Sequence, residues 1–357
     1  MKKNIGTKTT LFSLHLSPLD LSQKDVSITM QQIVIWQNGT LQFSCSPDQI
    51  HDALEDDQAV IWLDIQFDGT LQKYQDLLQK EFRLLPLVIE MIQEDKERAK
   101  LIGHGHYFYL VVHSLIFDAK NIETTTPKLD IVFGKNFLIT AHQTTLPWLD
   151  DLHATIHNEE TKDSFIRQGI SYLLHVLMDN LVDSYFPVLD EIDDLVDDLE
   201  DATVQQATNE VQARIFRMKR VLAQMRRVIS PQVEVSNSLI TRTGDFIPAE
   251  VEPYFADVHD HLIRTFEVLD SYRDLMSSLL DVYLTTVSNR QNEIMKQLAL
   301  ISTIFLPITF ITGVFGQNFG LSPQIAFDKG YNFWIVLAVM VIISIVQIWY
   351  FRYRRWI

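Results

Sequence analysis

The sequence contains a single cysteine, Cys45, so one chain can form neither an internal disulfide nor a zinc site with several thiolates. It also lacks a Gly-x-x-x-x-Gly-Lys-Ser/Thr nucleotide loop, a nucleophile elbow and metal-hydrolase spacing, and we therefore expect no enzymatic activity and no nucleotide. Basic residues are outnumbered: 30 Lys and Arg face 46 Asp and Glu, for a formal charge of -16. Nucleic-acid binding depends on neutralising phosphates, so this balance argues against it. An excess of acid suits a cation partner, or serves solubility alone.

Charged residues are also missing from two late stretches, residues 297–327 and 330–351. Each is longer than the roughly 20 apolar residues that a helix needs to cross a bilayer. We therefore predict a protein with two membrane spans at its C-terminal end.

The charges that flank these spans predict the topology. Arg352, Arg354 and Arg355 follow the second span, whereas the segment between the spans carries only Lys329, offset by Asp328. By the positive-inside rule the C-terminus is cytoplasmic, and two spans place the N-terminus on the same side. We expect a multi-pass protein of the cell (inner) membrane.

The part before the spans divides into two. Residues 1–165 mix β-like runs with helix-period stretches, which predicts a cytoplasmic α/β domain. Residues 166–250 predict an antiparallel helical hairpin: one helix over 163–202 with an acidic end, and a basic helix over 210–229 that Pro231 ends. The two opposite charges either pair with each other or leave an acidic rim that attracts a metal ion.

Beyond its first turn, the stretch 251–315 contains no glycine or proline before Pro307, which predicts one stalk helix, roughly 98 Å long, that continues into the first span. Along it, small and polar residues recur at steps that average 3.5 residues, so one stripe faces a common axis in a left-handed bundle. We call this stripe the seam. It consists of Asp281, Ser288, Asn292, Met295, Ala299, Ser302, Leu306, Thr309 and Gly313.

The seam has two interpretations that its spacing does not separate. A ring of such helices would enclose a narrow, partly polar path with apolar constrictions at Met295 and Leu306. Alternatively, the small residues simply let the helices of a two-span anchor pack closely. Pro307 cannot donate to the carbonyl of Thr303, so that carbonyl marks either a kink or an additional pore oxygen.

The first span ends in Phe315-Gly316-Gln317-Asn318-Phe319, and here the sequence resembles the CorA family of divalent-metal transporters, whose signature at this point is Tyr-Gly-Met-Asn-Phe. The resemblance continues along the stalk and to the C-terminal tail. It is carried by Glu252-Pro253-Tyr254-Phe255, Asn292-Glu293-Ile294-Met295-Lys296, Phe305-Leu306-Pro307-Ile308-Thr309 and Tyr350-Phe351-Arg352. It implies an extracytoplasmic loop at 316–332, a second membrane helix at 333–351 and a basic cytoplasmic tail at 352–357.

The resemblance implies a homopentameric funnel that imports hydrated Mg²⁺, with Co²⁺ and Ni²⁺ as further candidates, through a channel driven by the membrane potential. The ion is cargo and a possible regulator, and no cofactor is expected. Gly316, Gln317 and Asn318 would form the selectivity filter. The implied pore-lining positions are Asp281, Asn292, Met295, Leu298, Ser302, Leu306, Thr309 and Gly313.

The chain departs from the family pattern at two places. Gln317 replaces the family's methionine, and the loop carries no acid before Asp328. The family's regulatory ion is bound between neighbouring subunits by a stalk acid, here Asp257, and by acids in a Pro-Leu-x-x-Glu-Asp segment. Met91 replaces the second acid of this segment, which leaves Glu90 or Glu94 as substitutes, and methionine is a poor ligand for magnesium. We expect this regulatory site to be weakened.

The sequence contains two pairs of histidines, each pair spaced two residues apart. We interpret His104 and His106 as loop residues, and His259 and His261 as interface or capping residues of the stalk.

A zinc or other transition-metal transporter resembling ZntB, with possible proton coupling, is the nearest alternative to a magnesium channel. A non-conducting, membrane-anchored sensor is the second.

Overall fold

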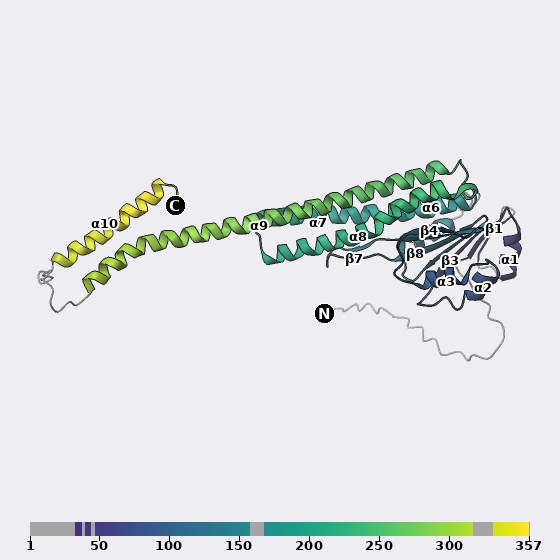
Figure 1. Cartoon of the computed structure of the whole chain (residues 1–357), viewed down its shortest axis with the longest axis horizontal. Helices are drawn as coiled ribbons and strands as arrows, with labels where there is room; N and C mark the ends of the chain where they lie inside the picture. Colours follow the sequence, from purple (N-terminus) through teal and green to yellow (C-terminus); the bar gives the residue numbers. More distant parts are fainter. Residues whose placement is uncertain (1–32, 38–39, 44–46, 158–167, 317–330, 357) are drawn as a thin grey trace, which may run out of the picture.

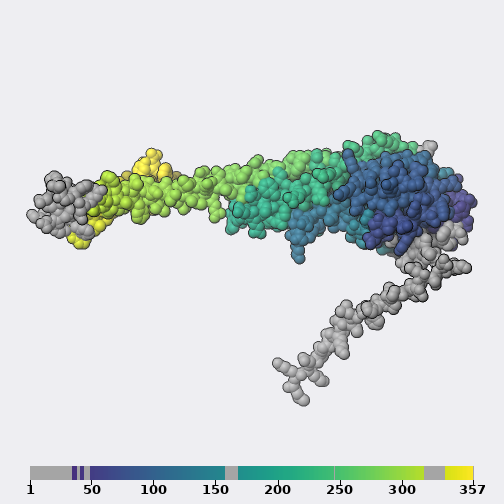
Figure 2. Space-filling model, turned by 60° about the horizontal axis from the view of Figure 1, so that its bottom comes forward, coloured from purple at the N-terminus to yellow at the C-terminus, as the bar shows by residue number. Residues whose placement is uncertain are grey.

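The computed structural model describes residues 33–37, 40–43, 47–157, 168–316 and 331–356. An α/β domain occupies one end of an elongated molecule, and a single helix leaves it and runs to the other end (Figure 1). A space-filling view shows this helix as a narrow rod that emerges from a broad head (Figure 2). The predicted order of an α/β domain, helices, one very long helix and a C-terminal helix is confirmed.

A seven-stranded sheet in the order β2-β1-β3-β9-β8-β5-β4 forms the centre of the α/β domain. Of its neighbouring strands, β3 and β9 pair in parallel and the others pair antiparallel. A separate two-stranded sheet joins β6 to β7. The strands are β1 (Ile33–Gln37), β2 (Thr40–Phe43), β3 (Val60–Gln66), β4 (Lys100–Gly103), β5 (Tyr107–His113), β6 (Ile116–Asp118), β7 (Glu123–Thr125), β8 (Lys128–Gly134) and β9 (Phe137–His142).

Apolar side chains cover both faces of the large sheet, because its central strands are apolar at successive positions. In β3, Trp62 packs into one core, while Ile61 and Leu63 pack into the other. Helices α1 (Pro47–Glu55), α2 (Gln75–Lys80) and α3 (Pro86–Gln93) lie on the face of Ile61 and Leu63. Helix α4 (Pro147–His157) and the helices that follow it pack on the face of Trp62.

Among the described residues, the helices after α4 are α6 (Ile170–Asp183), α7 (Tyr185–Gln205), α8 (Asn209–Arg242) and, after the short turn η1 (Gly244–Phe246), α9 (Glu252–Gly316). The predicted single helix over 163–202 is wrong in its described part, because α6 ends at Asp183 and α7 begins at Tyr185. Pro187 explains the break, since its nitrogen cannot donate to the carbonyl of Asp183.

Pro231 does not end α8, contrary to the prediction from sequence, and the helix continues to Arg242. A proline inside a helix costs about 3 kcal/mol. Beyond it, however, Val235 and Leu239 are buried, and burying each such side chain contributes about 1.5–3 kcal/mol. Packing against α9 therefore outweighs the local cost.

The helix α9 has 65 residues, and α10 (Tyr331–Tyr353) runs back beside its far end (Figure 1). Among the described residues, these two helices are long and apolar enough to cross a membrane. Their packing against each other leaves most of the far end of α9 uncovered in one chain.

Candidate ion pathway and metal cluster

The predicted pore-lining side chains share one property, since all of them are exposed in the single chain. The apolar members are the most informative, because water does not stabilise them: Met295 is 58% exposed, Leu298 56% and Leu306 74%. The exposed set comprises Asp281, Asn292, Met295, Leu298, Ser302, Leu306, Thr309 and Gly313.

Helix α10 covers the other side of α9. There Leu300 is buried, and Ile304, Pro307, Ile308 and Ile311 are half-buried. Successive residues of an α-helix are rotated by roughly 100°, so this face and the seam lie on roughly opposite sides of α9. The second membrane helix of the same chain therefore leaves the seam free.

The carbonyl that Pro307 leaves without a helical donor faces α10. The Gln347 side chain donates a hydrogen bond from Nε2 to the Thr303 carbonyl, at 3.0 Å. The hypothesis that this carbonyl is an additional pore oxygen is therefore wrong, because a side chain behind the seam binds it.

Of the predicted filter, only Gly316 belongs to the described residues, as the last residue of α9. Gln317 and Asn318 lie outside them. Within the described part of the chain, a Cβ atom at Gly316 would meet no atom within 4 Å, so no contact there requires glycine.

A group of potential metal ligands joins α6 to the start of α9. Asp179 of α6 and Asp257 and His261 of α9 each offer one ligand atom, and these atoms lie within 4.8 Å of one another. Burial, and next the charge of Asp183, raise the pKa of the Asp179 carboxyl above its ordinary value. The Nδ1 atom of His261 is buried and has no hydrogen-bond partner among the described residues. We call these three residues the stalk cluster.

Sequence reasoning identified Asp257 as a metal ligand, gave His261 an interface or capping role, and missed Asp179. The four-residue spacing of Asp257 and His261 places both on one face of a helix and could have signalled them as a pair. Asp179 is distant in sequence, and only the packing of α6 on α9 brings it close. His259, in contrast, lies 2.8 Å (Nδ1) from Ser236 Oγ and outside the cluster.

Glu90 is exposed on α3, which covers the opposite face of the sheet from α9, so one chain does not bring Glu90 and Asp257 together. Beside it, Lys100 donates from Nζ to the sulfur of Met91, at 3.4 Å, and pairs with Glu97 at 2.7 Å. The position where the family carries its second acid thus holds a thioether next to an ammonium. Both features disfavour a cation there.

Of the two alternatives for these opposite charges, the described residues show no ion pair between the acidic helix α7 and the basic helix α8, and side chains of each bond to α9. Arg226 of α8 pairs with Asp270 at 2.9 Å, and Lys219 donates to Ser277 at 3.0 Å. The hydroxyl of Tyr272 donates to Asp193 of α7 at 2.8 Å. The prediction that His104 and His106 lie in a loop is confirmed, since they connect β4 to β5.

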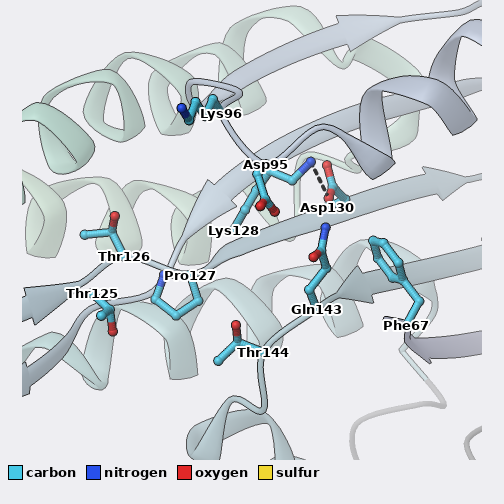
Figure 3. A pocket seen from close by; sticks show the side chains of 10 residues that line it. All are labelled: Phe67, Asp95, Lys96, Thr125, Thr126, Pro127, Lys128, Asp130, Gln143 and Thr144. Carbon is cyan, nitrogen blue, oxygen red and sulfur yellow. Dashed lines mark ion pairs between the residues drawn. The ribbon is translucent and has the colours of Figure 1, made fainter. Parts of the chain in front are cut away.

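A hollow of about 410 Å³ opens where the parallel strands β3 and β9 end (Figure 3). The Lys128 ammonium pairs with Asp130 at its wall, at 3.0 Å, and burial raises the pKa of Asp130 to about 7. Lys128 also donates to the carbonyls of Met91 and Ile92 at the end of α3. These bonds tie the lysine to the fold and give it a structural role.

Three comparisons with known proteins found similar sequences and a similar fold. A family model described as "CorA-like Mg2+ transporter protein" matches residues 57–355. The cobalt/magnesium transport protein CorA of Thermotoga maritima is 35% identical over 276 residues, which cover 77% of this chain and 78% of that protein. The protein of the same name from Methanocaldococcus jannaschii is 26% identical over 302 residues, or 85% and 93% of the two chains. The complete structure of the M. jannaschii CorA magnesium transporter superposes with a TM-score of 0.74, at 24% identity, and covers 84% of this chain and 92% of that one.

Proposed function

The chain belongs to the CorA-like Mg²⁺ transporter family, and from this premise we propose that it imports hydrated divalent cations, Mg²⁺ foremost, through a pore that five copies form together. The observation that carries the proposal is the exposed seam of α9. Leu306 and Met295 expose more than half of their surface on the side that α10 leaves free. In a ring of five copies, the seam of each α9 faces the common axis, and the five seams together form the wall of a pore.

The side chains of the seam suit a hydrated ion. Magnesium keeps its water shell and prefers oxygen, so a pore can hold it through water without stripping it. Asp281, Asn292, Ser302 and Thr309 supply oxygen atoms along the path. Met295, Leu298 and Leu306 form the apolar constriction, which blocks ions by excluding water.

The proposed entrance and driving force follow from sequence and charge. Asn318 belongs to the filter at the outer end, together with Gly316 and Gln317. The arginines after the second span keep both termini in the cytoplasm of a cell whose inner membrane holds the protein. At 100 mV the membrane potential contributes about 4.6 kcal/mol to the entry of a divalent ion.

The stalk cluster is the proposed regulatory site. Two carboxylates and one imidazole bind Co²⁺, Ni²⁺ or Zn²⁺ better than Mg²⁺, because imidazole is a weak ligand for magnesium. Glu90 reaches such an ion only from a second copy, because in one chain it lies on the other face of the sheet. With Met91 and Lys100 beside Glu90, feedback by internal Mg²⁺ is weaker than with two acids at that place.

Metal uptake into proteoliposomes tests the function. Mg²⁺, Co²⁺, Ni²⁺ and Zn²⁺ are supplied separately, with and without a membrane potential and a proton gradient. Asn318→Ala and Asn292→Ala test the filter and the seam, and Asn289→Ala, also exposed on α9 but off the seam, is the matched control.

We expect potential-driven Mg²⁺ uptake that both pore variants reduce and the control leaves unchanged. Zn²⁺ uptake that follows the proton gradient would select the zinc-transporter alternative. No flux of any ion in the assembled protein would favour the non-conducting sensor.

A further inference from the structure

A hydrogen bond links α10 to α9 close to Pro307, in the interior of α9. In an uninterrupted helix the N–H of residue 307 would donate to the carbonyl of Thr303, but proline has no N–H. The Gln347 amide of α10 takes this place and donates to the same carbonyl at 3.0 Å. A side chain of the second membrane helix thus completes the backbone of the first.

We propose that Gln347 is a positioning residue of the pore, which replaces the helical donor missing at Pro307 and so holds α9 in its conducting alignment. The proposal rests on the conducting function argued above. Gln347 bonds to the backbone of α9 on the side away from the seam. It acts through α9, because Leu306, the most exposed residue of the proposed constriction, is the neighbour of Pro307 in the chain.

The apolar surroundings make this bond consequential. Within a bilayer no water is available to satisfy a free carbonyl, so a neighbouring side chain has to do so. Buried side chains also pack near this bond: Leu300 lies about one turn before Thr303, and Phe351 lies about one turn after Gln347. The two helices therefore pack together at the level of the bond.

The other atom of the amide argues for a specific role. Gln347 Oε1 is buried and has no hydrogen-bond partner among the described residues. A buried acceptor without a partner is destabilising, and an apolar side chain of the same length would avoid this. The chain nevertheless carries glutamine here, which is explained if the donor at Nε2 is needed at the proline.

A double-mutant cycle tests the proposal, because Pro307→Ala restores the N–H that Gln347 replaces. The parent, Gln347→Met, Pro307→Ala and the double variant are assembled in full length and compared by Mg²⁺ flux in proteoliposomes. Ser344→Ala is the matched control, since its hydroxyl donates to Met340 within α10 at 2.9 Å and not to α9.

With Pro307 in place, we expect Gln347→Met to lower the maximal Mg²⁺ flux by about threefold to eighteenfold, the range that corresponds to interhelical hydrogen bonds in membrane proteins. The half-saturating Mg²⁺ concentration stays the same, because the amide does not touch the ion. In the Pro307→Ala background, the same change alters the flux less than about twofold, since the helix then binds its own carbonyl. Equal losses in the two backgrounds, or no loss in either, would overturn the proposal.

Thermal dissociation of the assembled oligomer is measured on the same variants and does not depend on flux. Gln347→Met is expected to lower the dissociation temperature when Pro307 is present and not in the Pro307→Ala background. If Gln347→Met assembles only together with Pro307→Ala, the proposal is supported, and if neither form assembles, it is refuted. If the parent conducts no ion, the proposed function fails, and the dissociation temperatures alone decide whether Gln347 compensates for Pro307.

Discussion

Removing one hydroxyl, by Tyr185→Phe, tests whether the sheet is joined to helices α7 and α8 as the structure indicates. Tyr185 is fully buried at the start of α7, and its hydroxyl donates to the carbonyl of His113 in β5 at 2.6 Å. The same hydroxyl lies 3.3 Å from Gln232 Oε1 of α8, which accepts the N–H of His113 at 3.0 Å. One sheet strand and two helices thus meet at this hydroxyl.

The expected magnitude follows from burial. Burial holds the pKa of Tyr185 above its ordinary value, so the hydroxyl is protonated and able to donate at any physiological pH. Its removal leaves a buried carbonyl without this donor, which costs about 1–3 kcal/mol. For a unit of 150–250 residues, this corresponds to a melting temperature lower by about 2–12 °C.

Thermal unfolding of the full chain in detergent measures this shift, with Tyr254→Phe as the control because that side chain is 47% exposed. We expect the control to stay within about 1 °C of the parent, as surface substitutions usually do. Equal melting temperatures for Tyr185→Phe and the parent would refute the reasoning, because the hydroxyl would then contribute nothing to the connection between β5 and helices α7 and α8.

Three further predictions concern regulation and the head domain. Met91→Asp is expected to lower the internal Mg²⁺ concentration that half-inhibits flux, whereas Met91→Leu leaves it unchanged; equal inhibition curves would contradict the weakened site. His261→Ala is expected to reduce the thermal stabilisation by Co²⁺ more than that by Mg²⁺, and His259→Ala to affect neither, as calorimetry of the full chain with each ion would show. Asp64 is buried in the sheet: burial opposes its charge, but hydrogen bonds from His142 and His153 lower its pKa to about 2. Burial disfavours the charged form of His142, yet the bond to Asp64 raises the pKa of His142 above 6.5. The stabilisation due to His142 is therefore complete below pH 6.5 and is lost as the pH rises through the raised pKa. Asp64→Asn should accordingly cost more stability at pH 6 than at pH 9, and a pH-independent difference would refute the pairing.

The sequence predicted the long helix and the two helices of membrane-spanning length well, and the seam, which stays a prediction, rests on the same kind of signal. Each rests on a local pattern: uncharged runs of bilayer length, a stretch without helix breakers, and a spacing of 3.5 residues. The helix α9 begins and ends within one residue of the expected range. The role of Asn318 stays a prediction from the motif, since the residue lies outside the described part of the chain.

Local sequence patterns failed to predict the features that depend on contacts between segments distant in the sequence. Proline disfavours a helix locally, yet α8 continues beyond Pro231 because Val235 and Leu239 are buried. Asp179 joins the stalk cluster only because α6 packs on α9.

The sequence by itself therefore determined the order of the elements, the two membrane-spanning segments and the stripe of α9 that the proposed pore uses, because these depend on spacing along one helix. Only the tertiary structure decided which partner each charged side chain or free carbonyl binds. It assigned Arg226 and Lys219 of α8 to α9, and it assigned the carbonyl freed by Pro307 to Gln347 rather than to the pore. Hydrogen bonds and ion pairs form over a few ångströms in space, and no sequence spacing specifies which residues 44 positions apart will meet.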